Sequence, residues 1–469
     1  MEGRGSGGVE LGFAEAVGSL GPVLACRSWG QWDGGKLGGR PLWLTLGGGA
    51  PLPSCACGAC GQPLLLLAQV YAPLEDAEAQ HDDAYHRALY VLACARGACV
   101  NVAGRAGGVR VLRSQLPRAN ALLPPNADDA IERPAWVSTP ESPLCCLCGF
   151  PAPSRCARCR GPRYCSRAHQ LAHWRLGHKG ECAAAGGAGE AGAGGEAGAA
   201  PLALALRAGA VLPEWDIAID EEPSAAARAL HAERSLPPEA AKALRALRSG
   251  GSAVPAAPAG EEEGGEPLSI TGLSQRELNE AVGSSPAADA ALVEFEVRTA
   301  CAQDQVLRYS GWWPSAPPAP PAPAPRPSSG GAAAVQGGEE EEEEEEEGEG
   351  FAEGPGVPLW FSSAAQPAPG DIPACARCGA ARVFELQVMP QALHFALGAG
   401  VEEAAVSLDF GTVAIYTCSR SCPLGAEVPL VEEVAWVQTS GEKRDKGEGA
   451  AGAAAAPAAA QGAGMAGLD

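Results

Sequence analysis

The sequence predicts a mainly β fold of the α+β class, in which a small β domain occurs twice and a compact module rich in cysteine and histidine is inserted between the copies. Short apolar runs bounded by turn-forming residues predict the strands. Cysteine pairs at matched spacings predict the duplication. The chain has 62 Gly and 41 Pro among 469 residues. Long stretches therefore have too few large apolar side chains to offset the conformational entropy lost on folding, and disordered linkers are predicted between the folded parts.

Strand-like runs in the first copy lie at Leu64–Tyr71, Ala88–Ala93 and Val109–Leu112. Each is mostly apolar and is bounded by turn formers, as expected of a β-strand. In the second copy the run GTVAIYTC leads into Cys418 as RALYVLAC leads into Cys94. The two copies therefore share strands as well as cysteines.

The duplication is carried by cysteines and glutamines at equal offsets. In each copy a CxxC pair is followed nine residues later by a Gln-Val dipeptide, then by a second cysteine pair, and sixteen residues after that by another glutamine. The first copy has Cys57, Cys60, Gln69, Cys94, Cys99 and Gln115, and the second has Cys375, Cys378, Gln387, Cys418, Cys422 and Gln438. Agreement at both offsets favours duplication over chance.

The central module contains eight ordered ligand-type residues: Cys145, Cys148, Cys156, Cys159, Cys165, His169, His178 and Cys182. Structural zinc takes four cysteine or histidine ligands, so eight make two sites. The segment from Ser166 to His178 has helical composition, and ligands at i and i+4 then share one helix face. Cys146 and His173 are nearby competitors for the ligand positions.

The redox setting supports metal binding. MEGRGSGG at the start has no apolar stretch, and the longest apolar runs are far below the roughly 18 residues of a membrane span. We therefore expect a soluble, intracellular protein with no membrane partner. In a reducing compartment 18 cysteines at short spacings indicate metal sites rather than disulfides.

Each copy of the β domain is predicted to hold one zinc with four thiolates, Cys57, Cys60, Cys94 and Cys99 in the first and Cys375, Cys378, Cys418 and Cys422 in the second. Alternatively, one copy has lost its metal and keeps buried cysteines as small apolar residues. Cys55 competes with Cys57, while Cys26 and Cys301 have no partner and are expected to be structural thiols. Four full shells keep no open position for catalysis, so the sequence predicts no enzyme.

The net charge of the chain is −22, and Glu339–Glu347 is an unbroken acidic run. Such a chain repels phosphate backbones, so direct nucleic-acid binding is not expected and a basic client is favoured. Around the central module the sign reverses, since seven basic residues face only Glu181. That excess either contacts RNA or an acidic partner, or it offsets the negative charge of thiolate-rich zinc shells.

The central series, with YC-S-x-x-H from Tyr164 to His169 and the ending WRLGHK-x-x-C, resembles a MYND zinc finger. The resemblance implies interleaved ligation. Cys145, Cys148, Cys165 and His169 would hold one zinc, and Cys156, Cys159, His178 and Cys182 the other. It also implies proline-containing peptides as ligands of the finger.

The flanking sequence resembles the programmed cell death protein 2 family. The resemblance is carried by VELGF, GGRPLWL (38–44), CGxPLxLLxQVYAPL (60–74), SQLPR (114–118), LPEWDI, QVLRY, PLW (358–360) and DIPxCxxCGAxRxFExQVMPQxL (371–393). It implies a duplicated, β-rich, zinc-stabilised domain, shared with a yeast pre-ribosomal-RNA processing factor, into which a MYND-type zinc finger is inserted.

The resemblance also implies a function: a zinc-binding chaperone or adaptor for a basic small-subunit ribosomal protein of the uS5 type, acting on pre-40S particles in 40S ribosome biogenesis and rRNA maturation, in the cytoplasm and the nucleus. An acidic chain suits a cationic client. The alternative is a scaffold that depends on the MYND finger, in transcriptional regulation or apoptosis signalling.

The predicted organisation is as follows: 1–8 disordered, 9–118 the N-terminal half of the duplicated domain, 119–143 a loop, 144–182 the finger, 183–350 a largely disordered linker with acidic, Pro-rich and Glu-rich segments, 351–438 the C-terminal half, and 439–469 a disordered tail. Within the linker, helices are predicted around 225–248 and 275–282. Trp215, in PEWDIAIDEE, fits a docking peptide or a core position equally well.

Overall fold

The computed structural model describes residues 9–17, 35–44, 52–74, 82–105, 107–120, 143–187, 202–224, 227–228, 290–310, 356–368, 370–398, 401, 406–424 and 430–440. Cys26, most of the predicted helix 225–248, the predicted helix 275–282, the predicted disordered residues 1–8, the acidic run Glu339–Glu347 and nearly all of the tail lie outside these residues.

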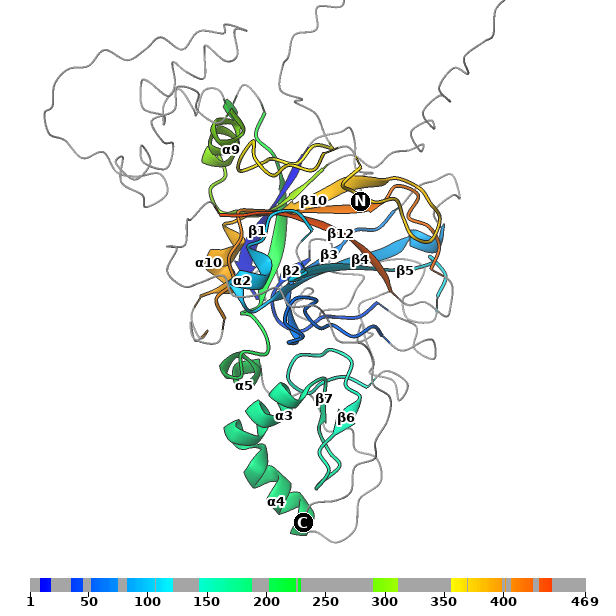
Figure 1. The fold of residues 1–469 in the computed structure, drawn as a ribbon, viewed down its shortest axis with the longest axis vertical. Coiled ribbons are helices and arrows are strands. Elements are labelled where there is room, and N and C mark those ends of the chain that lie inside the picture. The colour runs from blue at the N-terminus through cyan, green and yellow to red at the C-terminus, as the bar shows by residue number, and fades with distance from the viewer. Residues whose placement is uncertain are drawn as a thin grey trace, which may run out of the picture.

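Ten strands form one antiparallel barrel, and a two-stranded hairpin with short helices forms the finger (Figure 1). The barrel strands are β1 (Glu10–Ala16), β2 (Lys36–Leu37), β3 (Leu64–Tyr71), β4 (His86–Cys94), β5 (Val109–Leu116), β8 (Trp215–Glu221), β9 (Gln305–Tyr309), β10 (Arg382–Val388), β11 (Thr412–Cys418) and β12 (Val431–Gln438). The other elements are η2 (Asp82–Ala84), α2 (Gly97–Val100), β6 (Ser154–Arg155), β7 (Arg163–Tyr164), α3 (Arg167–His173), η4 (Trp174–His178), α4 (Lys179–Gly187), α5 (Leu202–Arg207), α9 (Ala290–Ala300) and α10 (Ala392–Ala396). Among the described residues, no helix has the length and apolar character needed to cross a membrane.

The barrel joins both copies of the repeat in one sheet. Its strand order is β1-β8-β2-β3-β4-β5-β12-β11-β10-β9, and β9 pairs with β1 to close the ring. The meander β3-β4-β5 of the first copy lies beside the meander β12-β11-β10 of the second. The mainly β prediction is confirmed. The two copies are not separate domains, because β5 of the first meander pairs with β12 of the second, and the outer strands β3 and β10 are covered by β2 and β9.

The two meanders match in detail. Both first strands carry a β-bulge seven residues after the CxxC pair, at Leu67 in β3 and at Glu385 in β10. Two residues further on, a buried glutamine clamps the backbone of a Pro-Leu-Trp segment with two hydrogen bonds. Gln69 accepts from the N–H of Leu42 (2.9 Å) and donates to its carbonyl (2.8 Å). Gln387 makes the same pair with Leu359 (2.6 and 2.9 Å). The repeat therefore extends to the PLW segments.

The region predicted as a linker contributes two strands to the barrel, β8 and β9. Trp215 begins β8, donates its indole N–H to the carbonyl of Phe395 (3.2 Å) and packs on that ring with centroids 5.3 Å apart. Trp215 is thus a packed residue rather than a free docking peptide. This corrects the predicted linker over 183–350 for these two segments. Composition missed them because each is short, and their burial depends on strands distant in the sequence.

Buried ion pairs hold the seam between β5 and β12, where only three residue pairs are in register. Arg113 of β5 lies 2.8 Å from Glu433 of β12, with both side chains fully buried. The other carboxylate oxygen of Glu433 accepts from Arg382 at 2.8 Å. Next to them, Arg110 pairs with Glu432 at the surface. Charged side chains therefore stabilise a junction between the two halves in which few residues pair through the backbone.

The finger is docked on the N-terminal half of the barrel. Trp43 donates its indole N–H to the carbonyl of Gly149 (2.8 Å) and packs between Tyr90 and Phe150. Arg40 donates to the carbonyl of Leu147 (2.7 Å). Both side chains grip the first CxxC turn of the finger, so the finger has a fixed attachment to the barrel.

Candidate metal centres

The sixteen cysteines and histidines predicted as ligands converge in four groups. In each group the four ligand atoms lie within 4.8 Å of one another. The groups are Cys57, Cys60, Cys94 and Cys99; Cys145, Cys148, Cys165 and His169; Cys156, Cys159, His178 and Cys182; and Cys375, Cys378, Cys418 and Cys422. The interleaved pattern implied for the finger is the one the structure forms.

The spacing of the sulfur atoms tests whether zinc fits. A Zn–S bond of about 2.3 Å in a tetrahedron places two sulfurs about 3.8 Å apart, whereas a disulfide needs about 2.05 Å. Sulfur pairs lie at 3.7 Å (Cys60 and Cys94), 3.5 Å (Cys148 and Cys165) and 3.8 Å (Cys375 and Cys422). Every cysteine in the described part of the chain is a free thiol. The donor sets fit zinc, with two sites in the finger and two on the barrel.

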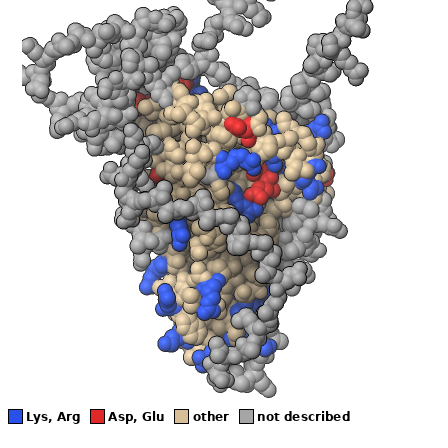
Figure 2. Space-filling model, viewed as in Figure 1, with Lys and Arg blue, Asp and Glu red and all other residues tan. Residues whose placement is uncertain are grey.

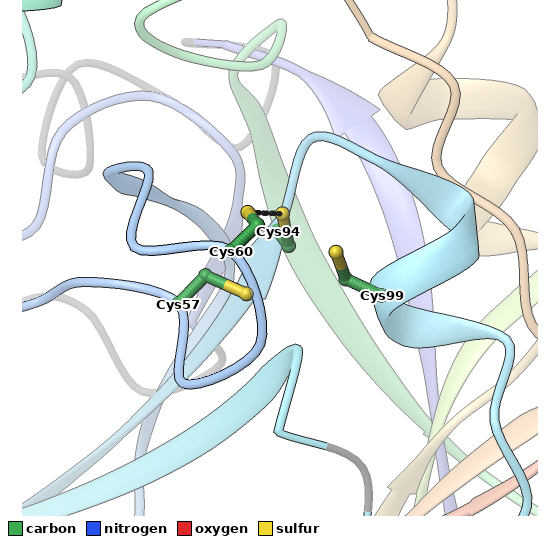
Figure 3. A group of neighbouring side chains, drawn as sticks. All are labelled: Cys57, Cys60, Cys94 and Cys99. Carbon is green, nitrogen blue, oxygen red and sulfur yellow. Dashed lines mark hydrogen bonds between the residues drawn. The ribbon is translucent and has the colours of Figure 1, made fainter. Parts of the chain in front are cut away.

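The N-terminal barrel site draws its ligands from three elements (Figure 3). Cys57 and Cys60 lie on the turn before β3, Cys94 ends β4, and Cys99 lies on α2. The competitor Cys55 is outside this group. The sulfur of Cys55 instead lies 3.5 Å from the carbonyl of Pro53. Cys57 is therefore the better ligand candidate.

The two finger sites use different histidine nitrogens. His169 places Nδ1 3.1 Å from the sulfur of Cys165, and His178 places Nε2 3.5 Å from that of Cys159. The Nδ1 of His178 lies 3.5 Å from the carboxylate of Glu181, a contact of the kind that orients a zinc-bound imidazole.

The two competitors in the finger are used elsewhere. The sulfur of Cys146 and Nδ1 of His173 lie 3.5 Å apart, and the hydroxyl of Tyr164 is 3.0 Å from the same nitrogen. All three residues are buried. They form a small polar contact inside the finger and belong to neither four-ligand group.

All four CxxC turns have one backbone geometry. The carbonyl of the first cysteine accepts a hydrogen bond from the N–H four residues later, at 2.8–3.0 Å. The donor residue has a positive φ in each turn: Gly61, Gly149, Arg160 and Gly379. Glycine suits this conformation, and three turns have it. The pattern CxxCG is a sequence signal that spacing alone overlooked.

The C-terminal barrel site is supported by the other half of the chain. Arg113 of β5 donates to the carbonyl of Cys422 (3.3 Å) and lies 3.8 Å from its sulfur. Gln115 donates to the carbonyl of Ser421 (3.0 Å). Reciprocally, the N–H of Ser407 in the second half donates to the carbonyl of Ala95, beside the N-terminal site (2.8 Å). Each site therefore depends on contacts from both halves.

These centres are structural in character. Each group supplies four ligands, which fills a tetrahedral shell and leaves no position for substrate or water. Zinc held in this way contributes folding free energy on the order of 10 kcal/mol in small domains. Each site takes its ligands from more than one segment of the chain, so two ions would cross-link segments within the barrel and two within the finger.

The comparisons with known proteins follow this layout. Residues 8–130 match the model of the programmed cell death protein 2 N-terminal domain, residues 351–439 match that of its C-terminal domain, and residues 145–182 match the MYND finger. Programmed cell death protein 2 of Bos taurus is 30% identical over 445 residues, which cover 93% of this chain and 98% of the relative. The chain belongs to the programmed cell death protein 2 family.

Two further relatives match this chain to very different extents. Programmed cell death protein 2-like of Mus musculus is 25% identical over 416 residues, 86% of this chain and 89% of the relative. Ubiquitin carboxyl-terminal hydrolase 15 of Arabidopsis thaliana is 48% identical over 48 residues, only 5% of the hydrolase. No solved structure matches the chain.

Proposed function

We propose that this member of the programmed cell death protein 2 family is a non-catalytic, zinc-stabilised chaperone or adaptor for a basic small-subunit ribosomal protein of the uS5 type, acting on pre-40S particles in ribosome biogenesis and rRNA maturation. The observation that carries the proposal is the family match over 93% of the chain, since the client class follows from the family resemblance. Cytoplasm and nucleus are the compartments this role requires.

Four ligand groups, each with a complete set of four ligands, support the non-catalytic part of the proposal. None of them keeps an open metal position, and the hydrolase relative shares only a short stretch with this chain. Enzymes need a reacting group in an accessible constellation. The described residues instead form a barrel and a finger with four complete groups of ligand-type side chains.

The distribution of charge bears on how a basic client would be held. The described residues include 22 of the 34 basic side chains but only 18 of the 56 acidic ones. The acidic excess therefore lies in the remaining segments, Glu339–Glu347 among them. Acidic segments attract a cationic client and yield it to rRNA, which carries more charge. In this proposal the acidic segments attract the client by charge, and the barrel provides the surface whose shape the client fits.

A pull-down during translation tests the proposal. Full-length tagged protein is isolated from translating cells, and the bound mRNAs and nascent chains are identified. We expect enrichment of one small-subunit ribosomal protein. The variant Cys375→Ser, which removes a ligand of a barrel site, should lose this enrichment. The variant Cys156→Ser should retain it, because its site in the finger does not include the CxxC turn that contacts the barrel. If the tagged protein is folded and zinc-loaded but no ribosomal-protein mRNA or nascent chain is enriched, the proposal is overturned.

One observation favours the finger-dependent scaffold as a second candidate. A cleft of about 530 Å³ lies between the finger and the barrel, lined on the finger side by Phe150, Pro151 and Pro153 and on the barrel side by Leu52 and Pro63. Its apolar walls suit a proline-containing peptide. In this case Cys156→Ser would abolish partner binding and Cys375→Ser would spare it, the reverse of the chaperone outcome.

A further inference from the structure

The described surface of the finger is basic on every exposed charged position but one. Arg155, Arg158, Arg160, Arg167, Arg175 and Lys179 are exposed, and Arg163 is half-buried. Glu181 is the one acidic residue between positions 143 and 187, and its carboxylate lies beside His178. On the face of the finger shown in Figure 2, the charged atoms are those of lysine and arginine.

The zinc shells do not account for this charge. A shell of three thiolates, one neutral histidine and Zn²⁺ carries a charge of −1, so the two finger shells together carry −2. Seven basic residues less Glu181 and the two shells leave a net charge of about +4 on some 45 residues. Most of the basic excess is therefore available to a partner.

The position of the charge reverses the expectation drawn from the chain as a whole. A net charge of −22 argues against nucleic acid, but the acidic excess lies outside the described residues, and the finger itself attracts anions. Six of the seven basic residues are arginines, whose planar guanidinium matches phosphate in two-point hydrogen bonds.

We infer that the basic face of the finger is a docking surface for the phosphate backbone of RNA. The choice of RNA over other polyanions rests on the proposed function, in which the protein works beside pre-rRNA. Leu171 is the one large apolar side chain exposed in the described finger, and the half-buried ring of Trp174 packs edge-on against His178, so the exposed surface is charged rather than aromatic. Recognition is therefore electrostatic and independent of sequence.

Salt-dependent binding of a single-stranded 20-nucleotide oligouridylate to the full-length, zinc-loaded protein tests the inference. Phosphate contacts by the six exposed basic residues give a slope of log K against log salt of about −4, and neutralising three of them reduces it by about 2. The test variant is Arg155→Gln/Arg167→Gln/Arg175→Gln. The matched control, Arg96→Gln/Arg105→Gln/Arg420→Gln, removes the same charge from exposed barrel positions. We expect only the finger variant to lose slope and at least tenfold in affinity at 100 mM salt.

A second variant of the full-length chain tests whether the acidic run hides RNA binding by the finger. In this variant all nine residues of Glu339–Glu347 are glutamine, which removes the strongest competing polyanion of the chain. Absence of binding by both proteins overturns the inference, and so does an equal loss of slope in the finger and barrel variants. Client capture is measured on the same samples. Its retention by a variant that has lost RNA binding separates this inference from the chaperone proposal.

Discussion

Glu433→Gln is the substitution whose cost the structure predicts most sharply. The carboxylate lies between the guanidinium groups of Arg113 and Arg382, at 2.8 Å from each, and both the Glu433 and Arg113 side chains are fully buried. Removing its charge leaves two neighbouring cations without compensation inside the barrel seam. Breaking a buried ion pair from one side costs about 3–5 kcal/mol. For a body of this size that lowers the melting temperature by roughly 6–20 °C.

The neighbouring residue supplies the control. Glu432→Gln makes the same chemical change one position earlier, in a surface pair with Arg110 whose carboxylate side chain is 54% exposed. Such pairs contribute about 0–1 kcal/mol. Urea unfolding of zinc-loaded protein, followed by tryptophan fluorescence, measures both variants. Equal losses of stability, or a loss below about 1 kcal/mol for Glu433→Gln, would refute the assignment of the seam to this buried triad.

Three further changes test other parts of the structure. Trp43→Phe removes the indole donor to the first finger turn and should raise amide hydrogen exchange across that turn about tenfold, while Trp436→Phe, which loses a similar bond to the carbonyl of a distant loop, should not. Burial lowers the pKa of His86 to about 4. The pKa of this imidazole in the unfolded chain is about 6.5, so between pH 6.5 and pH 4 the unfolded chain binds a proton that the folded chain does not. Stability therefore falls as the pH falls from 6.5 toward 4. Relative to His86→Asn, the wild type should lose about 2 kcal/mol of unfolding free energy between pH 8 and pH 5. Cys57→Ser should cost one zinc per chain in metal analysis, whereas Cys55→Ser should cost none; the opposite pattern would reassign the ligand.

Much of the metal chemistry could be predicted from the sequence, because ligand spacing is a local property. A CxxC turn brings two thiols together whatever surrounds it, and His169 follows Cys165 at the interval of one helical turn. The strands before the second cysteine pairs, β4 and β11, are also local signals, since their apolar runs are long and bounded.

The closure of the barrel depends on residues that no local pattern connects. β8 and β9 read as parts of a linker, yet each pairs on both sides with strands far away in the sequence. Arg113 lies one residue beyond the predicted strand Val109–Leu112, and only the fold shows that it belongs to β5 and reaches the carbonyl of Cys422. Non-local pairing of this kind sets the fold without a periodicity that a window could detect.

Net charge hides local charge for a related reason. It averages the basic finger with acidic segments elsewhere, although the two lie in different parts of the chain. A local count around the CxxC turns shows the excess of basic residues in the finger. It does not show whether these residues compensate the charge of the thiolates or form a binding face. The ligand groups of the structure fix how many thiolates need compensation, which leaves a basic excess for the binding face that we propose.

Counting the zinc bound to each chain tests the central claim most directly. Native mass spectrometry of the full-length protein, with atomic emission as an independent count, should find four zinc ions, and stepwise chelation should unfold the barrel as its two ions leave. A chain that carries two ions or fewer while its barrel remains folded would contradict the account.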